Sequence, residues 1–202
     1  MDVPEAAASG AIAGYREQVH QALHTVPEAR ILEAARALQE VHERGGRVFV
    51  LAAPSDELTG RHLSEELARG VAAGVFGFSP VALQSTPGQV AAWQGDWVYE
   101  DLFVEQMRGH VARGDVVVAL SRRGQELGLV RALGAARRAG ARTIALVGLD
   151  GGMLAGAADI CLHVRSSSLD QVEDVHTVLI HALCQGLRTL LAREPSGASA
   201  AP

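Results

Sequence analysis

Short, continuously apolar segments alternate with helix-forming segments along this chain, and this pattern constrains the fold most. Strands that are apolar on both faces are typical of parallel sheets covered by helices on either side. The sequence therefore predicts an α/β protein with a parallel sheet. A weaker strand, interrupted by Pro80, is predicted within residues 74–83. The four clearest strand segments cover residues 47–53, 115–121, 142–148 and 159–164.

Helical periodicity predicts two helices before the first strand, with apolar positions at residues 12–23 and 31–41. Pro27 breaks the run between them, because the residue before a proline avoids helical backbone angles. Gly45 and Gly46 end the second helix. Later helices are predicted near residues 57–69, 99–112, 126–139 and 169–193, with a short turn or helix beginning at residues 151–152.

Composition is consistent with one globular domain. Of the 202 residues, 48% are hydrophobic and 20% are charged, which is enough to build a core. We predict a flexible N-terminus over residues 1–10, a single domain with an N-terminal helical hairpin over residues 11–192, and a disordered tail over residues 193–202.

Charge and hydropathy argue against nucleic acid and membrane as binding partners. The net charge of −5 argues against general nucleic-acid binding. No apolar run approaches the roughly 18 residues that a membrane-spanning helix needs, and no signal-peptide pattern begins the chain. A cytoplasmic protein without membrane contact is the expectation.

Two histidines and two glutamates have spacings that place them as two pairs on predicted helices. His62 and Glu66 are four residues apart, and Glu173 and His181 are eight apart. Both spacings return to the same helical face. If the two faces meet, the cluster fits a divalent metal or a proton-transfer site. The competing interpretation is structural, since an isolated His-x-x-x-Glu pair is more often a solvated ion pair.

Two loops of interest follow predicted strands and start predicted helices. They are residues 52–57 and residues 121–126. Ligands of open parallel sheets bind beyond the carboxyl ends of the strands, and the N-terminus of a helix favours an anion. These loops are therefore the expected ligand-binding region.

Several segments, in order along the chain, resemble those of SIS-domain sugar-phosphate isomerases, and of the phosphoheptose isomerase family in particular. They are GGRVFVLA, RHLSEELA, GDWVYEDLF, ARGDVVVALS, LDGGMLAGAADICLHV and EDVHTVLIHALC. The resemblance covers roughly residues 45–191. It implies a three-layer α/β/α sandwich with a five-stranded parallel sheet and N-terminal helices. It also implies a homotetramer with active sites made between subunits and a phosphosugar ligand.

The resemblance also implies the site residues. In that family a His, a Glu four residues later, a Gln and a His eight residues after the Gln line the site and can hold a divalent metal, often zinc. Here they fall on His62, Glu66, Glu173 and His181, with glutamate replacing the family glutamine. The implied reaction is aldose–ketose isomerisation of sedoheptulose 7-phosphate through an enediol. Glu66 would be the base, His181 the acid/base partner, and Asp96 would shape the substrate site.

Both phosphate-side loops depart from the family pattern. The family's GNGGSA is AAPSDE at residues 52–57, and its usual STSGNS is SRRGQE at residues 121–126. A glycine-rich loop lets backbone N–H groups approach a phosphate, and residues 52–57 have lost those glycines, whereas the second loop keeps Ser121 and Gly124. Asp56 puts negative charge where relatives bind phosphate. Arg122 and Arg123 act in the opposite direction, because guanidinium groups bind phosphate bidentately.

The sequence is compatible with two functions. One is a sugar-phosphate isomerase with altered phosphate contacts. The other is a catalytically inactive SIS-domain protein that binds or regulates through a sugar-phosphate ligand or a protein partner, as do some relatives with an arginine at the position of Arg123. The substrate-binding residues expected with the isomerase are Ser55, Asp56, Asp96, Ser121, Arg122, Arg123 and Gly124.

The orientation of the two arginines is expected to discriminate between these functions. Guanidinium groups of Arg122 and Arg123 that point into an open cleft near the His/Glu cluster favour the enzyme. Neutralisation of these groups by Asp56 or Glu126, with the cleft filled, favours the binding protein.

Overall fold

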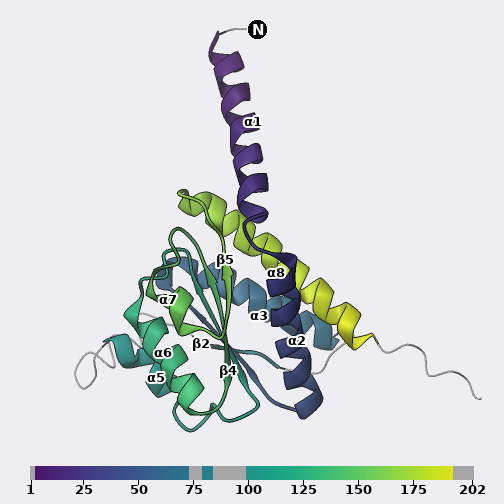
Figure 1. Ribbon diagram of the computed structural model, residues 1–202, viewed down its shortest axis with the longest axis vertical. Helices are drawn as coiled ribbons and strands as arrows, with labels where there is room; N and C mark the ends of the chain where they lie inside the picture. The colour runs from purple at the N-terminus through teal and green to yellow at the C-terminus, as the bar shows by residue number, and fades with distance from the viewer. Residues whose placement is uncertain (1–2, 73–78, 84–98, 193–202) are drawn as a thin grey trace, which may run out of the picture.

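The computed structural model describes residues 3–72, 79–83 and 99–192, and it shows a parallel sheet between two layers of helices (Figure 1). The sheet has five strands in the order β2-β1-β3-β4-β5, and every neighbouring pair is parallel. The α/β sandwich expected from the sequence is therefore confirmed. The strands are β1 (Val48–Ala52), β2 (Val81–Leu83), β3 (Val116–Ser121), β4 (Arg142–Val147) and β5 (Ile160–His163).

Strand β2 is one of the two edge strands of the sheet, and it corresponds to the last part of the weaker predicted segment, residues 81–83. It begins directly after Pro80, whose missing N–H group confines proline to edges and to the starts of strands. Residues 74–78 of the predicted segment lie outside the described residues.

Local signals in the sequence set the limits of several helices. Pro27 is the N-cap of α2, and Gly45 ends that helix in the left-handed region at φ +66°. The N–H groups of Gly45 and Gly46 bond back to carbonyls of the last turn. At α8, the hydroxyl of Ser168 accepts the N–H of Gln171 as an N-cap. The α-helices are α1 (Val3–Leu23), α2 (Glu28–Arg44), α3 (Glu57–Ala72), α5 (Leu102–Met107), α6 (Leu127–Arg138), α7 (Gly152–Ala157) and α8 (Leu169–Leu191), with 3-10 turns η1 (Pro54–Asp56) and η2 (Tyr99–Asp101).

Two helix predictions were wrong in their limits. Residues 3–10 belong to α1, which therefore begins earlier than predicted, because the alanine-rich start is strongly helix-forming and Glu5 lies in the first turn, where negative charge is favourable. The helix predicted over residues 99–112 is only the short α5 after η2. The chain leaves the helix at Arg108, and Gly109 follows in the left-handed region at φ +73°.

The two helical layers cover opposite faces of the sheet. Helices α2, α3 and α8 pack on one face, whereas α5, α6 and α7 pack on the other (Figure 1). The side chains of β3 alternate between these layers: Val118 and Leu120 face the first, and Val117 and Ala119 face the second.

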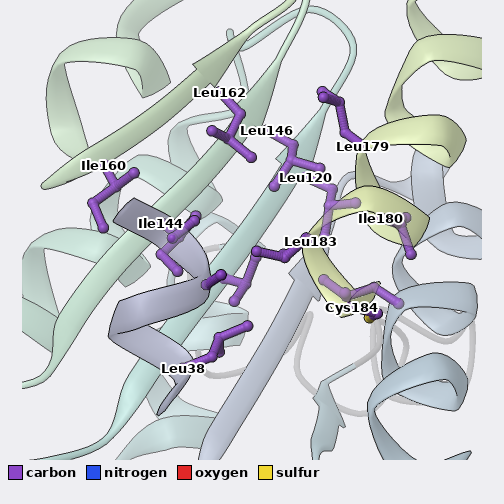
Figure 2. Packing of buried hydrophobic residues seen from close by; sticks show 14 of the residues in the cluster. Leu38, Leu120, Ile144, Leu146, Ile160, Leu162, Leu179, Ile180, Leu183 and Cys184 are labelled. Carbon is purple, nitrogen blue, oxygen red and sulfur yellow. The ribbon is translucent and has the colours of Figure 1, made fainter. Parts of the chain in front are cut away.

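The interior on the α8 side is almost entirely aliphatic. Figure 2 shows Leu179 and Leu183 of α8 facing Leu120 and Leu146 of the sheet, and all four side chains are fully buried. Burying a leucine side chain contributes about 1.5–3 kcal/mol, so this layer holds α8 firmly on the sheet. Helix α8 in turn carries candidate site residues on its other faces.

Candidate functional site

Three of the four predicted cluster residues meet where α3 packs beside α8. His62 and Glu66 lie on α3, and His181 lies on α8. The Nε2 atoms of the two histidines are 2.9 Å apart, and one imidazole can donate to the other when it carries the proton. One nitrogen of each ring and a carboxylate oxygen of Glu66 all lie within 4.8 Å of one another. This is a donor set that fits a metal ion or a proton relay.

Glu66 is the buried member of this cluster, with 5% of its surface exposed. Arg69 lies 2.9 Å from one carboxylate oxygen, and Arg188 donates to the other at 3.2 Å. The two guanidinium groups neutralise a charge that would be costly to bury alone. They also fix the orientation of the carboxylate beside His62 and His181.

Within one chain, Glu173 does not join the other three residues, so a single subunit does not assemble the predicted four-residue set. A separation of eight residues returns to the same helical face, but it also advances about 12 Å along the axis, which is too far for one ion to bridge. Glu173 instead lies 2.6 Å from Arg122 on the second loop.

The first loop is organised around the buried carboxylate of Asp56, which is 2% exposed. One of its oxygens accepts the Ser55 hydroxyl at 2.9 Å and the backbone N–H of Arg122 at 3.2 Å. The other lies 2.7 Å from Nε of Arg122. The carboxylate therefore binds hydrogen-bond donors from both loops. The resemblance to the isomerases predicted that these donors would face a phosphate.

The second loop has its own internal hydrogen bonds. The buried hydroxyl of Ser121 accepts the N–H groups of Arg123 at 3.1 Å and Gly124 at 2.6 Å, and it donates to the carboxylate of Glu126. Gly124 is in the left-handed region at φ +68°, and a Cβ there would be 2.2 Å from the carbonyl oxygen of Gly151. Ser121 and Gly124 thus shape the loop rather than present free groups to a ligand.

The two loop arginines have different environments. Arg122 is half-buried and is held by Asp56, by Glu173 and, through a 3.0 Å hydrogen bond, by the carbonyl oxygen of Ser55. Arg123 is exposed and lines a cavity of about 700 Å³. The neutralisation expected of a binding protein therefore holds for Arg122, whereas Arg123 is exposed to a cavity whose lining does not include the His/Glu cluster.

Sequence reasoning did not identify the other polar residues of this cavity. Asp150, Arg165 and Ser167 line it with Arg123 and Gln125. They follow the carboxyl ends of β4 and β5, where ligands of parallel sheets bind. Their position after predicted strands could therefore have identified them from the sequence. Asp96, predicted to shape the substrate site, lies outside the described residues.

Another buried titratable group lies next to the loops. His176 of α8 has no exposed surface, and burial lowers its pKa to about 4. The backbone of Val147 and the carboxylate of Asp56 raise the pKa, but they offset only part of the lowering by burial. The charge of Arg122 lowers the pKa further. His176 is therefore neutral at physiological pH and acts as a packing residue behind the two loops.

Among residues 3–72, 79–83 and 99–192, none of the helices combines the length and the apolar character needed to cross a membrane.

Comparison with known proteins agrees with this architecture. The SIS domain family model matches residues 97–177. Phosphoheptose isomerase of Vibrio cholerae is 30% identical over 158 residues, which are 78% of this chain and 82% of that protein. Phosphoheptose isomerase of Streptomyces coelicolor is 32% identical over 157 residues, covering 78% and 68%.

The solved structure of a phosphoheptose isomerase from Francisella tularensis has the same fold. It superposes with a TM-score of 0.80 at 23% identity, covering 90% of this chain and 98% of that one. The structure of phosphoheptose isomerase from Neisseria gonorrhoeae gives a TM-score of 0.76 at 22% identity, covering 93% and 100%.

Proposed function

The chain belongs to the phosphoheptose isomerase family of sugar-phosphate isomerases, and on this premise we propose that it interconverts sedoheptulose 7-phosphate and an aldose phosphate. The observation that carries the proposal is the convergence of His62, Glu66 and His181 from two helices. Isomerisation needs a base beside the reacting carbon and a group that moves protons between two oxygens. The cluster supplies both kinds of group.

The proposed chemistry is a pair of proton transfers. Glu66 removes a proton from carbon 1 of the ketose, and the electron pair forms a carbon–carbon double bond as the carbonyl oxygen on carbon 2 is protonated. The resulting enediol regains a proton at carbon 2 and loses one from the oxygen on carbon 1, which forms the aldose. His181, in contact with His62, carries the oxygen protons.

The same donor set fits zinc. Two imidazole nitrogens and one carboxylate oxygen are a known ligand set of catalytic zinc and leave a position for substrate. When bound, zinc would polarise the substrate carbonyl as a Lewis acid. Because Glu66 serves in both the metal site and the proton transfer, turnover has to be compared with and without zinc.

We further propose a cytoplasmic homotetramer with active sites shared between subunits. In one chain Glu173 lies about 12 Å along α8 from His181, as the helical rise requires. A second subunit is therefore needed if Glu173 is to act at the same site as the cluster. Sedimentation of the purified protein tests the tetramer directly.

Turnover is the decisive test of the proposed function. Zinc-supplemented protein is given sedoheptulose 7-phosphate, and the aldose product is followed by NMR. We expect turnover that falls at least about 100-fold in Glu66→Gln, because the base is lost while the shape is kept. Absence of turnover in the folded, zinc-loaded wild type would contradict the proposal.

Zinc occupancy tests the metal site separately. We expect His62→Ala and His181→Ala each to lower zinc affinity at least about 10-fold, since each removes a ligand of the cluster. His110→Gln, an exposed histidine elsewhere, is the control. Unchanged occupancy in both alanine variants, measured by metal analysis after dialysis, would exclude the cluster as a zinc site.

One observation favours the alternative function of a binding or regulatory protein, namely the pairing of Arg122 with Asp56 and Glu173. Family membership counts against this alternative. A folded protein that binds sugar phosphate tightly but leaves it unchanged in the NMR assay would establish the alternative.

A further inference from the structure

A phosphate group that approached between the two loops would meet carboxylates instead of free donors. The carboxylate of Asp56 accepts the Ser55 hydroxyl and the Arg122 N–H, and the carboxylate of Glu126 accepts the Ser121 hydroxyl. Both carboxylates begin helices, where their charge is favourable and an additional anion is repelled. A phosphorylated substrate therefore needs another place for its phosphate.

The cavity on the other side of the second loop offers such a place. It lies at the carboxyl ends of β3, β4 and β5, and its volume is about 700 Å³. Arg123 enters it from the loop after β3, and Arg165 from the segment after β5. Within the described part of the chain, neither guanidinium group forms an ion pair, in contrast to Arg122.

The rest of the lining is compatible with an anion. The hydroxyl of Ser167 is exposed, and α8 begins two residues later with its positive dipole end. Asp150 is the one acidic residue among the lining residues, and one of its oxygens already accepts the N–H of Gly152 at 3.2 Å. The two arginines outweigh this single negative charge.

We propose that the phosphate of the substrate binds in this cavity, between the guanidinium groups of Arg123 and Arg165. The inference rests on the proposed function, because it assigns the phosphate position of the same phosphosugar. Guanidinium groups suit this role, since each can donate two parallel hydrogen bonds to phosphate oxygens.

The distance to the cluster sets a condition on this assignment. Ser167 lies just before α8, and His181 lies about 18 Å along that helix from its first residue, Leu169. A heptose phosphate is too short to span that distance, so the reacting end of the sugar has to meet a cluster of another subunit. The assignment therefore agrees with the proposed sharing of sites in a tetramer.

Calorimetric binding of sedoheptulose 7-phosphate and of inorganic phosphate at low salt tests the assignment. We expect Arg123→Gln and Arg165→Gln each to weaken the affinity for both ligands about tenfold or more, because each removes charge-assisted hydrogen bonds. Asp150→Asn, which keeps an acceptor for Gly152, should strengthen binding a few-fold. Arg36→Gln, an exposed arginine of α2, is the matched control and should change nothing.

We expect the variants to fold like the wild type, so that changes in affinity report on ligand binding. Arg165 is exposed, and its structural hydrogen bond is made by its backbone N–H to the Thr25 hydroxyl at 2.9 Å, so Arg165→Gln retains it. Thermal unfolding of each variant verifies this. Affinities that are unchanged in both Arg123→Gln and Arg165→Gln, or a wild type that binds neither ligand, would overturn the assignment.

The turnover assay separates this assignment from the proposed function. Binding that depends on Arg123 and Arg165 without any turnover would support the phosphate position and contradict the isomerase. Turnover with a KM that is unchanged in both variants would support the isomerase and overturn the phosphate position.

Discussion

At the scale of single residues, Arg122 connects parts of the chain that are far apart in sequence. It joins the first loop at Asp56 and Ser55 to the start of α8 at Glu173. Asp56 is almost fully buried, and the guanidinium group of Arg122 offsets the cost of burying its carboxylate. The ion pair therefore holds the two loops against each other.

Removal of Arg122 should be costly for this reason. We expect Arg122→Gln to lower the free energy of unfolding by about 3–5 kcal/mol, because it leaves the buried Asp56 carboxylate without its counter-charge. In the double variant with Asp56→Asn the loss should be smaller than the sum of the two single losses. Urea unfolding of the four proteins measures this coupling, and additive losses would show that the two side chains do not interact.

His176 should make the fold sensitive to acid. Its pKa of about 4 in the folded state lies below the ordinary value of 6.5, so the unfolded chain binds the extra proton between these values. Stability from this residue is complete above pH 6.5 and is lost as the pH falls toward 4, by roughly 3 kcal/mol in total. The groups that face His176 are Asp56, Arg122 and the backbone of Val147.

Unfolding in urea at pH 7 and pH 4.5 measures this effect. A His176→Leu variant removes the titrating ring, so its stability should fall less than that of the wild type over this interval, whatever its stability at pH 7. An equal fall in both proteins would assign the acid sensitivity to other groups.

The residues of the site illustrate what a sequence can predict. His62, Glu66 and His181 came together because α3 and α8 both carry their polar residues on faces that the sheet does not cover. Glu173 did not, because periodicity reports direction around a helix and not distance along it. The pairing of Arg122 with Asp56 depends on loop geometry, which no periodic pattern encodes.

At the scale of elements, the position of α3 depends on its close approach to β1. A Cβ on Gly60 of α3 would lie 2.7 Å from Cβ of Ala52 on β1. Only small residues on both elements allow this packing distance. His62 and Glu66 lie two and six residues after Gly60 on the same helix, so the packing distance also sets the position of the cluster.

We expect Gly60→Ala to destabilise the protein by about 1–3 kcal/mol through overpacking, and to weaken zinc binding as α3 moves outward. The double variant Ala52→Gly with Gly60→Ala removes the clashing methyl group and should restore zinc binding. Thermal unfolding and metal analysis of the three proteins provide the measurement. Full zinc affinity in Gly60→Ala alone would mean that the cluster tolerates the shift.

The strands were easier to predict than the helices. Each of β1, β3, β4 and β5 contains a run of consecutive apolar residues, and such runs are typical of a parallel sheet covered on both faces. The limits of α1 and α5 were missed because they depend on weaker effects. These are the helix propensity of alanine in α1 and a single left-handed glycine after α5.

At the scale of the whole molecule, α1 extends away from the body and contacts it mainly through α8 (Figure 1). Ile12 and Tyr15 on α1 are exposed, and the Tyr15 hydroxyl donates to Asp174 of α8 at 2.7 Å. A helix in this position can contribute little to the core of one subunit. In the proposed tetramer its exposed side chains are available to contact other copies.

We therefore expect Ile12→Glu to weaken the tetramer, because it puts a charge on the apolar surface of α1, while the fold of each subunit is retained. Sedimentation velocity over a concentration series, with circular dichroism to follow helix content, is the measurement. Ile12→Leu is the conservative control. A tetramer of unchanged stability in Ile12→Glu would show that α1 does not contribute to the interface.

The strand order also bears on how the chain folds. Strands β3, β4 and β5 are neighbours both in the sheet and along the chain, whereas β1 pairs Val48 with Val116 across a long stretch of sequence. Pairing over long separations closes large loops and is slow. The C-terminal half is therefore expected to form first, with the edge of β3 unprotected until β1 arrives. During that interval the chain is most vulnerable to aggregation through strand addition.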